Sequence, residues 1–204
     1  MKRPAAKPRN RELTRQRILQ CALELFAENG YDGATTREIA SRAGVNHTMI
    51  AFYYGGKEKL WNSAVDWLFE ESIRAVDLEA VDRGANDVER FELLVRHYVR
   101  YSARHPEHAR LVIQESLRPG KRLRRIVALA RRHHEAVAPL IGRLMDQGHI
   151  VRMDPVSIAY IFSSACQSVF VLAREASGIY GKRVLSEAFI ESHVAAVISL
   201  FLRR

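Results

Sequence analysis

Hydrophobic residues recur along this chain at the three- and four-residue spacing of helices, and no stretch alternates with the two-residue period of a strand. In the stretch 10–28, Ile18, Ala22 and Leu25 share one face, and Gly30 follows as a stop signal. The sequence therefore predicts an all-α protein of about nine helices. The other eight are expected at about 36–43, 47–54, 57–81, 86–104, 106–117, 121–147, 156–176 and 184–202.

The second and third predicted helices are short and lie close together. Thr35 and Glu38 have the spacing at which a capping hydroxyl and a returning carboxylate satisfy the free amides of a helix start. Gly44 is the residue expected where a helix closes through a left-handed turn, and Asn46 can cap the helix that follows. Two helices joined in this way have the form of a helix-turn-helix, which places its second helix in the major groove of DNA.

The sequences on either side extend this pattern. TRQRILQCALELFAENGYDG precedes the unit and GGKEKLWNSAV follows it. Together they resemble the DNA-binding domain of the tetracycline-repressor (TetR) family over residues 12–66, sharing Ala-x-x-Leu-Phe, Gly-Tyr, Thr-Thr, Ile-Ala, Ala-Gly-Val, an aromatic pair and Lys-Glu. Beyond residue 66 the resemblance is only architectural. It implies a transcriptional regulator whose remaining helices hold a small-molecule effector, and the effector is expected to move the fourth helix.

The predicted contacts with DNA divide into those that position the protein and those that read bases. Arg37 has the fork that fits guanine, and Thr48 and Phe52 can contact a thymine methyl group. Lys57 falls in the first turn of a helix, where free amides and an ammonium group together suit a phosphate. The full set of predicted DNA-binding residues is Thr35, Thr36, Arg37, Asn46, His47, Thr48, Phe52, Tyr53 and Lys57.

The recognition helix departs from the common pattern of the family, which reads approximately Val-Ser-x-Gly-Thr-Leu-Tyr-x-Tyr-Phe. Here Val45 is followed by NHTMIAFYY, so that Ala51 stands where the family has its usual phosphate-contacting tyrosine. The roles of the three aromatic residues at 52–54 are therefore left open. Met49 and Ile50 are expected in the core.

The charge balance favours an anionic partner without identifying it. The 204 residues include 32 Lys plus Arg against 23 Asp plus Glu, a formal charge of +9. Residues 1–60 hold 11 basic and 6 acidic groups, so positive charge is densest around the helix-turn-helix. A second basic run, from Arg118 to Arg132, has no acidic residue before Glu135. It could attract an acidic ligand or a protein partner, or form a solvated helix face.

The chain is predicted to divide into a mobile basic arm (1–9), a helix-turn-helix DNA-binding domain (10–56) and a helical effector-binding and dimerisation domain (57–204). The last two helices are apolar around most of their circumference, and such helices must bury more than one side. They are therefore expected to pack with their mates from a second subunit as a four-helix bundle. A homodimer has two recognition helices related by a two-fold axis, so double-stranded DNA with a palindromic operator is the expected partner.

No metal, cofactor or membrane span is expected. Cys21 and Cys166 are isolated in apolar patterns, and His105 with His108, or the run His133 to Glu135, offer too few ligands for zinc. The N-terminal sequence lacks an apolar signal region, and a cytoplasmic protein is predicted. Candidate effector-pocket residues are Trp67, Tyr98, Tyr101, Gln114, Glu115, His133 and Gln167.

Three functions remain open on this sequence, and a ligand-responsive repressor is favoured. The second is a DNA-binding factor whose helical domain serves protein contacts rather than ligand sensing. A sealed hydrophobic core in that domain, without a cavity, would favour it. The third is a helical enzyme that uses residues such as Glu115 and His133, but no arrangement of nucleophile, base and orienting group is legible.

Overall fold

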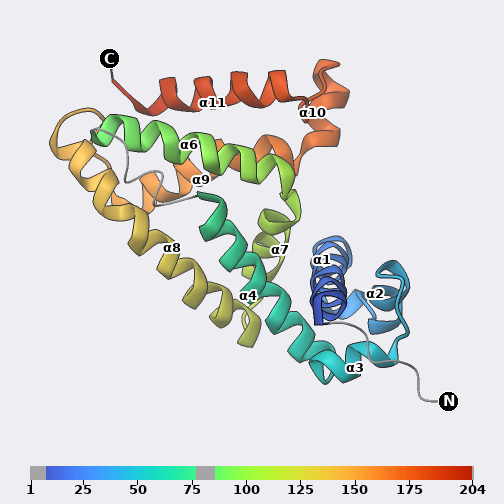
Figure 1. Ribbon diagram of the computed structural model, residues 1–204. Helices are drawn as coiled ribbons and strands as arrows, with labels where there is room; N and C mark the ends of the chain where they lie inside the picture. The colour runs from blue at the N-terminus through green and yellow to red at the C-terminus, as the bar shows by residue number, and fades with distance from the viewer. Residues whose placement is uncertain (1–7, 77–85, 204) are drawn as a thin grey trace.

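The computed structural model describes residues 8–76 and 86–203, and every regular element in these two ranges is an α-helix (Figure 1). The all-α prediction is confirmed. The described helices are α1 (Pro8–Gly33), α2 (Thr36–Arg42), α3 (Thr48–Tyr54), α4 (Lys57–Val76), α6 (Asp87–Arg104), α7 (Pro106–Ser116), α8 (Lys121–Asp146), α9 (Pro155–Val171), α10 (Ala173–Tyr180) and α11 (Glu187–Phe201).

The first helix begins earlier than predicted and has a kink near its predicted end. It already includes residues 8 and 9, which were assigned to the mobile arm, while residues 1–7 of that arm lie outside the described residues. The long helix is interrupted at Gly30 as predicted, because Gly30 has a non-helical backbone (φ 70°, ψ 171°), and a further helical turn after this kink extends α1 to Gly33. The predicted end of the fourth helix, at residue 81, also lies outside the described residues.

The predicted helix 156–176 is wrong in its C-terminal part. The α9 helix ends at Val171, Leu172 leaves helical geometry (φ −99°, ψ 25°), and α10 continues at a bend of 71°. The bend frees the Val171 carbonyl, which accepts a hydrogen bond from the Arg110 guanidinium (3.2 Å). No single described helix is long and apolar enough to cross a membrane, and α9 with α10 reaches that length and apolarity only across the bend.

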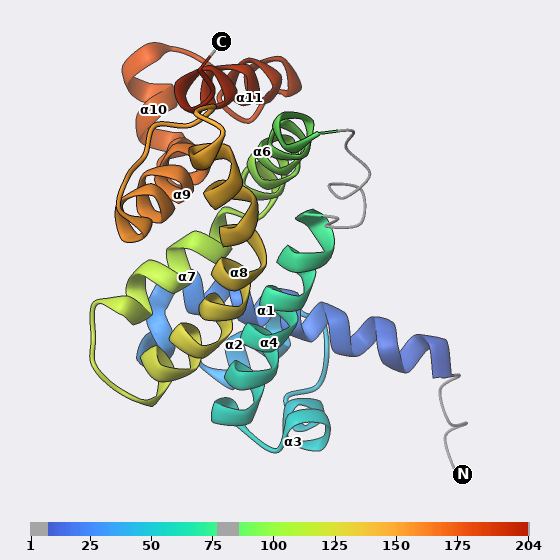
Figure 2. The ribbon, with the colours of Figure 1, turned by 90° about the vertical axis from the view of Figure 1, so that its left-hand side faces the viewer.

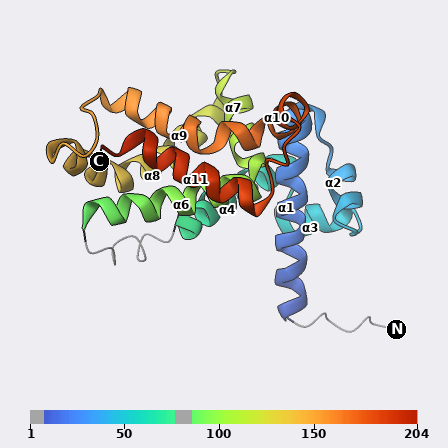
Figure 3. The same ribbon diagram turned by 90° about the horizontal axis from the view of Figure 1, so that it is seen from above.

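The molecule has a head at one end and a helical body above it (Figures 1 and 2). The head consists of α1, α2 and α3, and α4 rises from it between α1 and α8. At the far end α11 lies on top of α6 and α9, and Figure 3, seen from above, shows α11 running between these two helices. The last helix begins at Glu187, three residues later than predicted, with Ser186 as its cap.

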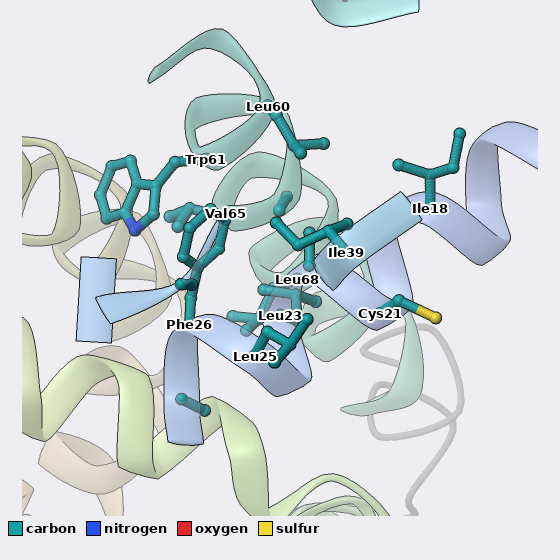
Figure 4. Close-up of a cluster of buried hydrophobic side chains, with 14 of the residues drawn as sticks. Ile18, Cys21, Leu23, Leu25, Phe26, Ile39, Leu60, Trp61, Val65 and Leu68 are labelled. Carbon is teal, nitrogen blue, oxygen red and sulfur yellow. The ribbon is translucent and has the colours of Figure 1, made fainter. Parts of the chain in front are cut away.

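Two separate clusters of buried hydrophobic side chains hold this arrangement together. The head core joins α1 to α2 and α4, and in Figure 4 Leu23 and Phe26 gather with Ile39, Leu60 and Val65. It continues into the body through Leu111 of α7 and Ile126 of α8, so it crosses the predicted domain boundary at residues 56 and 57. The upper core packs α6 against α9 and α11, with these residues buried: Phe91, Leu94, Val95, Val99, Cys166, Phe170, Val194, Val197 and Phe201.

Candidate nucleic-acid interface

The start of α2 is fixed by the reciprocal cap that the sequence predicts. The Glu38 amide donates to the Thr35 hydroxyl (3.2 Å), and the Thr35 amide donates to the Glu38 carboxylate (2.9 Å). Hydrogen bonds from the Thr35 side chain and backbone lower the pKa of the Glu38 carboxyl. Two of the free amides at the helix start are thereby satisfied, which sets the direction in which α2 leaves the chain.

The turn between α2 and α3 also follows the predicted chemistry. Gly44 has the left-handed backbone (φ 63°) that glycine tolerates best, and the Val45 amide closes the turn on the Ala40 carbonyl (2.9 Å). The Asn46 carboxamide oxygen accepts from both the amide (3.0 Å) and the hydroxyl (2.9 Å) of Thr48. The α3 helix therefore begins at Thr48, one residue after its predicted start.

The three aromatic residues of α3 have three different environments. Tyr54 is buried and donates to the Arg15 carbonyl (3.0 Å), so it ties α3 to α1, and burial raises the pKa of its phenol. Tyr53 is half-buried against the head core, and its ring meets that of Phe52 edge-on at 5.1 Å. Phe52 is 78% exposed. Ile50 is buried as predicted, and Phe52 is thus the aromatic residue that α3 presents to solvent.

The predicted base-reading residues all lie on the outside of the head. Arg37, His47, Thr48 and Phe52 are exposed, as are Thr35 and Asn46. Within the described residues, neither the Arg37 guanidinium nor the His47 ring has a side-chain partner. Of the remaining predicted contacts, Thr36, Tyr53 and Lys57 are half-buried.

Lys57 lies at the junction of α4 with the end of α1. Its ammonium is 3.4 Å from the Asp32 carbonyl and 4.5 Å from the centre of the Tyr31 ring. A cation over an aromatic face is held by electrostatic attraction to the ring. The Lys57 ammonium therefore has a defined position before DNA binds. The Arg122 guanidinium of α8 lies over the same ring, 4.2 Å from its centre.

Three of the predicted effector-pocket residues meet between the two cores, where polar side chains form a layer that we call the polar layer. Tyr98, Tyr101 and Gln167 line a cavity of about 10 Å³, and the Tyr98 hydroxyl donates to the Gln167 carboxamide oxygen (3.2 Å). Sequence reasoning did not include the other residues that line the cavity. They are Ser102, His105, His108 and Ala109.

The other four predicted pocket residues do not line this cavity. The His133 ring contacts the Ser72 hydroxyl (3.0 Å) and packs edge-on against Phe69, whose ring also meets His108. His133 therefore belongs to the polar layer, one ring away from the cavity. The remaining three lie toward the head: Trp67 is half-buried against the head core, Gln114 donates to the Ala27 carbonyl (3.0 Å), and Glu115 pairs with Arg122 (2.8 Å).

Burial favours the uncharged forms of four side chains of the polar layer: Tyr98, Tyr101, His108 and His133. It lowers the pKa of His108 to about 3 and also lowers the pKa of His133, because a protonated ring would be deprived of water in the protein interior. Burial raises the pKa of the Tyr98 and Tyr101 phenols. The layer therefore offers neutral hydrogen-bonding groups at physiological pH.

A chain of polar contacts leads from the layer to the head. His105 contacts the Glu107 carboxylate (3.1 Å), and Gln20 of α1 donates to the same carboxylate (3.4 Å) and to Glu24 (3.0 Å). Burial acts to raise the pKa of the Glu107 carboxyl, but hydrogen bonds from His105 and a backbone amide outweigh it, and the net shift is downward. Arg42 of α2 lies 3.8 Å from Glu24 and completes the connection.

A capped helix-turn-helix that exposes polar and aromatic side chains, carried on a larger helical body, is the architecture of DNA-binding regulatory proteins. A family model described as bacterial regulatory proteins of the tetR family matches residues 18–64. A second model, described as the tetracyclin repressor-like C-terminal domain, matches residues 88–200. The chain belongs to the tetR family. Its relatives are regulators rather than enzymes, and no group of three metal-ligating side chains occurs among the residues that the structure describes.

Several curated proteins resemble this chain in sequence. The transcriptional repressor NicS of Pseudomonas putida is 31% identical over 127 residues, which cover 62% of this chain and 59% of NicS. The repressor Rv3405c of Mycobacterium tuberculosis is 37% identical over 73 residues, 36% of this chain and 39% of Rv3405c. The regulator RutR of Escherichia coli is 22% identical over 88% of this chain and 84% of RutR. The matches to the first two span less than two thirds of those proteins.

Solved structures share the fold at low sequence identity. The hemolysin II transcriptional regulator HlyIIR superposes with a TM-score of 0.61 at 22% identity, covering 95% of this chain and 99% of that one. The fatty acid degradation regulator FadR of Bacillus halodurans has a TM-score of 0.64 at 19% identity, covering 90% and 97%. These similarities extend the family fold across the body as well as the head.

Proposed function

We propose that this protein is a sequence-specific transcriptional repressor that a small-molecule effector releases from a palindromic operator. The observation that carries the proposal is the outer surface of the head, where Arg37, His47, Thr48 and Phe52 are exposed on a capped and rigid frame. Groups that bind bases must be accessible, and among the described residues the Arg37 guanidinium and the His47 ring also have no internal side-chain partner. The relatives NicS and Rv3405c are described as transcriptional repressors, which supports repression rather than activation.

The experiment that tests DNA binding is selection of bound sequences from random duplexes, followed by fluorescence anisotropy with single variants. Lys57→Ala is expected to weaken binding to every sequence and to flatten its dependence on salt, because it removes a phosphate contact. Arg37→Ala is expected to cost about 1–3 kcal/mol of discrimination at one base pair and little affinity for random DNA. Selection that enriches no sequence would contradict the proposal, and identical effects of the two variants would contradict the division of roles.

We propose further that α9 and α11 join two subunits. The face of α9 away from the upper core exposes Ser157, Ile161, Ser164 and Ser168, and the corresponding face of α11 exposes Ala188, Ser192, Ala195 and Ser199. Apart from Ile161 these side chains are small, and small side chains at this spacing let helices of two subunits approach closely. Ser164→Arg with Ala195→Arg is expected to give monomers in sedimentation analysis and to abolish tight operator binding. The same substitutions at exposed Ser116 and Ala136 of the body serve as the control.

The proposed effector site is the polar layer. A cavity of about 10 Å³ is far smaller than the several hundred Å³ of a typical ligand pocket, so an effector has to bind a form in which the layer is open. The effector then shifts the equilibrium by its preference for that form. The neutral, hydrogen-bonding lining of Tyr98, Tyr101 and Gln167 favours a small polar ligand.

Two sets of contacts can carry the opening to the head. The Tyr101 hydroxyl donates to the Leu68 carbonyl (3.4 Å) and His133 contacts Ser72, so the layer is bonded directly to α4. Glu107 is bonded to Gln20 of α1. A thermal-shift screen of small molecules first identifies the effector. Glu107→Gln is then expected to preserve DNA affinity but to reduce the release of DNA when the effector is added. Full release from the Glu107→Gln variant would rule out the α1 route.

The small cavity also supports the second function, in which the body contacts other proteins. The two functions differ in a measurable way. A ligand that raises the Tm of the wild type and loses this effect on Gln167→Leu supports sensing. Tm values unchanged across the screen, together with a protein partner whose binding depends on the body, would support the alternative.

A further inference from the structure

We infer that the exposed basic face of α8 is a second surface for the DNA backbone, next to the half-site that the head reads. This inference rests on the proposed function, since it extends the same complex. It concerns Lys121, Arg124, Arg131 and Arg132, which fall within one side of α8 and are exposed. Among the described residues, none of these four cations has a carboxylate within ion-pair distance.

Arg122 and Arg125, the neighbouring cations of α8, are instead bound to other parts of the protein: the head, α4 or α7. Arg125 pairs with Asp66 of α4. Arg122 pairs with Glu115 and covers the ring of Tyr31. These contacts, made on the inner side of α8, fix the orientation of the helix and turn the four unpaired cations outward.

The position of α8 connects this face to the predicted phosphate contact. Arg122 and Lys57 lie over the same Tyr31 ring, so the first turns of α8 stand beside the start of α4. Arg118, in the loop before α8, also reaches Asp32 at the end of α1 (3.8 Å). Figure 2 shows the first turns of α8 at the head end of the molecule, with the helix rising away from it. The first turns of α8 therefore place basic side chains close to the predicted phosphate contact of the head.

The dimensions favour a nucleic-acid backbone as the occupant. From residue 121 to residue 132 the helix rises about 16 Å, at about 1.5 Å per residue, and duplex DNA carries a negative charge about every 1.7 Å of its axis. Exposed, mobile cations on long side chains suit phosphates, which they neutralise without fixed geometry. An acidic protein is the competing occupant, but it would not explain why the cations adjoin the site of Lys57.

The test compares two triple variants that remove equal charge. In the first, Lys121, Arg124 and Arg131 are replaced by Gln. In the control, Gln replaces Lys182, Arg183 and Arg203, which are exposed at the other end of the body. Both are measured by anisotropy on selected DNA in two lengths, one cut at the edges of the half-sites and one extended by about a helical turn at each side.

On the extended duplex we expect the α8 variant to bind about tenfold more weakly than the control and its salt slope to fall by about 2 to 3. On the short duplex the affinities of the two variants should agree within about twofold, because this duplex lacks the flanking phosphates that the α8 face would contact. Hydroxyl-radical footprints of the α8 variant should lose protection outside the half-sites while keeping it inside.

Equal behaviour of the two triple variants on the extended duplex would overturn the inference. So would an α8 variant that binds DNA normally but loses binding to poly-glutamate, which would assign the face to an acidic protein. Wild-type protein that binds neither duplex contradicts the proposed function itself, so the two failures are distinguishable.

Discussion

The outer surface of the head and the polar layer of the body use similar residue types in opposite ways. On the head, Arg37 and His47 are exposed and make no side-chain contacts within the described residues. In the layer, Tyr98, Tyr101 and His133 are buried or half-buried and each makes a hydrogen bond inside the protein. A surface that reads DNA needs free groups on a rigid frame, whereas a layer that changes state needs groups whose partners can be exchanged.

This difference separates binding from stability. Substitutions on the head surface should alter DNA affinity and leave the fold intact, because little is buried there. Substitutions in the polar layer should alter the free energy of unfolding first, because an unsatisfied buried group costs more than a lost surface contact.

The largest effect is expected from truncation of Tyr101, whose residue is only 7% exposed and whose ring packs against His105 and His108. Tyr101→Ala should lower the free energy of unfolding by about 3–5 kcal/mol, as for other large buried aromatic residues. Phe52→Ala, at a 78% exposed site, should change it by less than about 0.5 kcal/mol while weakening DNA binding. Urea unfolding of both variants measures the contrast, and Tyr101→Phe, which keeps the ring, is the control.

A second prediction concerns acid, to which the polar layer should respond. Burial lowers the pKa of His108 to about 3 and lowers that of His133, so the unfolded chain takes up protons first as pH falls. Stability should therefore decline below the unfolded histidine pKa of about 6.5, by about 1.4 kcal/mol per pH unit for each fully buried ring. Urea unfolding should show a loss of about 1–3 kcal/mol between pH 7 and pH 5.5.

His108→Gln is the matched variant for this pH effect. It keeps a neutral polar side chain of similar reach, so its stability should depend less steeply on pH than that of the wild type over the same interval. An unchanged slope in His108→Gln would place the acid response elsewhere in the molecule.

The third prediction separates the two roles of Asn46 on the head. Asn46→Ala removes the acceptor for the Thr48 amide and hydroxyl and should cost about 1 kcal/mol of stability. Asn46→Asp keeps the acceptor, so stability should be retained, but it places a negative charge beside DNA and should weaken binding. Calorimetry and anisotropy on the two variants test this, and equal DNA affinity of Asn46→Asp and wild type would remove Asn46 from the interface.

The sequence predicts a region well when the residues that interact there are close together in the chain, and poorly when they are far apart. The caps of Thr35 and Asn46 and the turn at Gly44 involve residues a few positions apart, so the head was readable from local patterns. Of the predicted pocket residues, Tyr98 and Gln167 do meet, although they are 69 positions apart. Gln114 and Glu115 are also polar residues of the body, but Gln114 is bound to the backbone of α1 and Glu115 to Arg122. Composition alone could not distinguish these two situations.

The parts that sequence reasoning missed depend on tertiary packing. His105 and His108 stand on either side of the Pro106 helix break, and only the packing of Tyr101 and Phe69 on them brings them to the cavity. The bend at Leu172 has no proline or glycine to announce it. The continuity of the head core into α7 and α8 likewise arises from contacts between distant segments.

The smallest effect is expected from the ion pair between Arg42 and Glu28, which lies on the head but resembles the layer in being doubly hydrogen-bonded (3.0 and 2.9 Å). The hydrogen bond from Arg42 lowers the pKa of the Glu28 carboxyl, so the pair contributes stability above the unfolded glutamate pKa and loses it in acid. Both side chains are more than a third exposed, and such pairs contribute less than about 1 kcal/mol. Arg42→Gln should therefore lower stability by about 0.5 kcal/mol in dilute salt and by almost nothing in 1 M salt, as measured by urea unfolding. A loss well above 1 kcal/mol that persists in high salt would instead show that Arg42 belongs with Glu24 and Gln20 to the buried route from the polar layer, and the separation between surface and interior would then fail at this point.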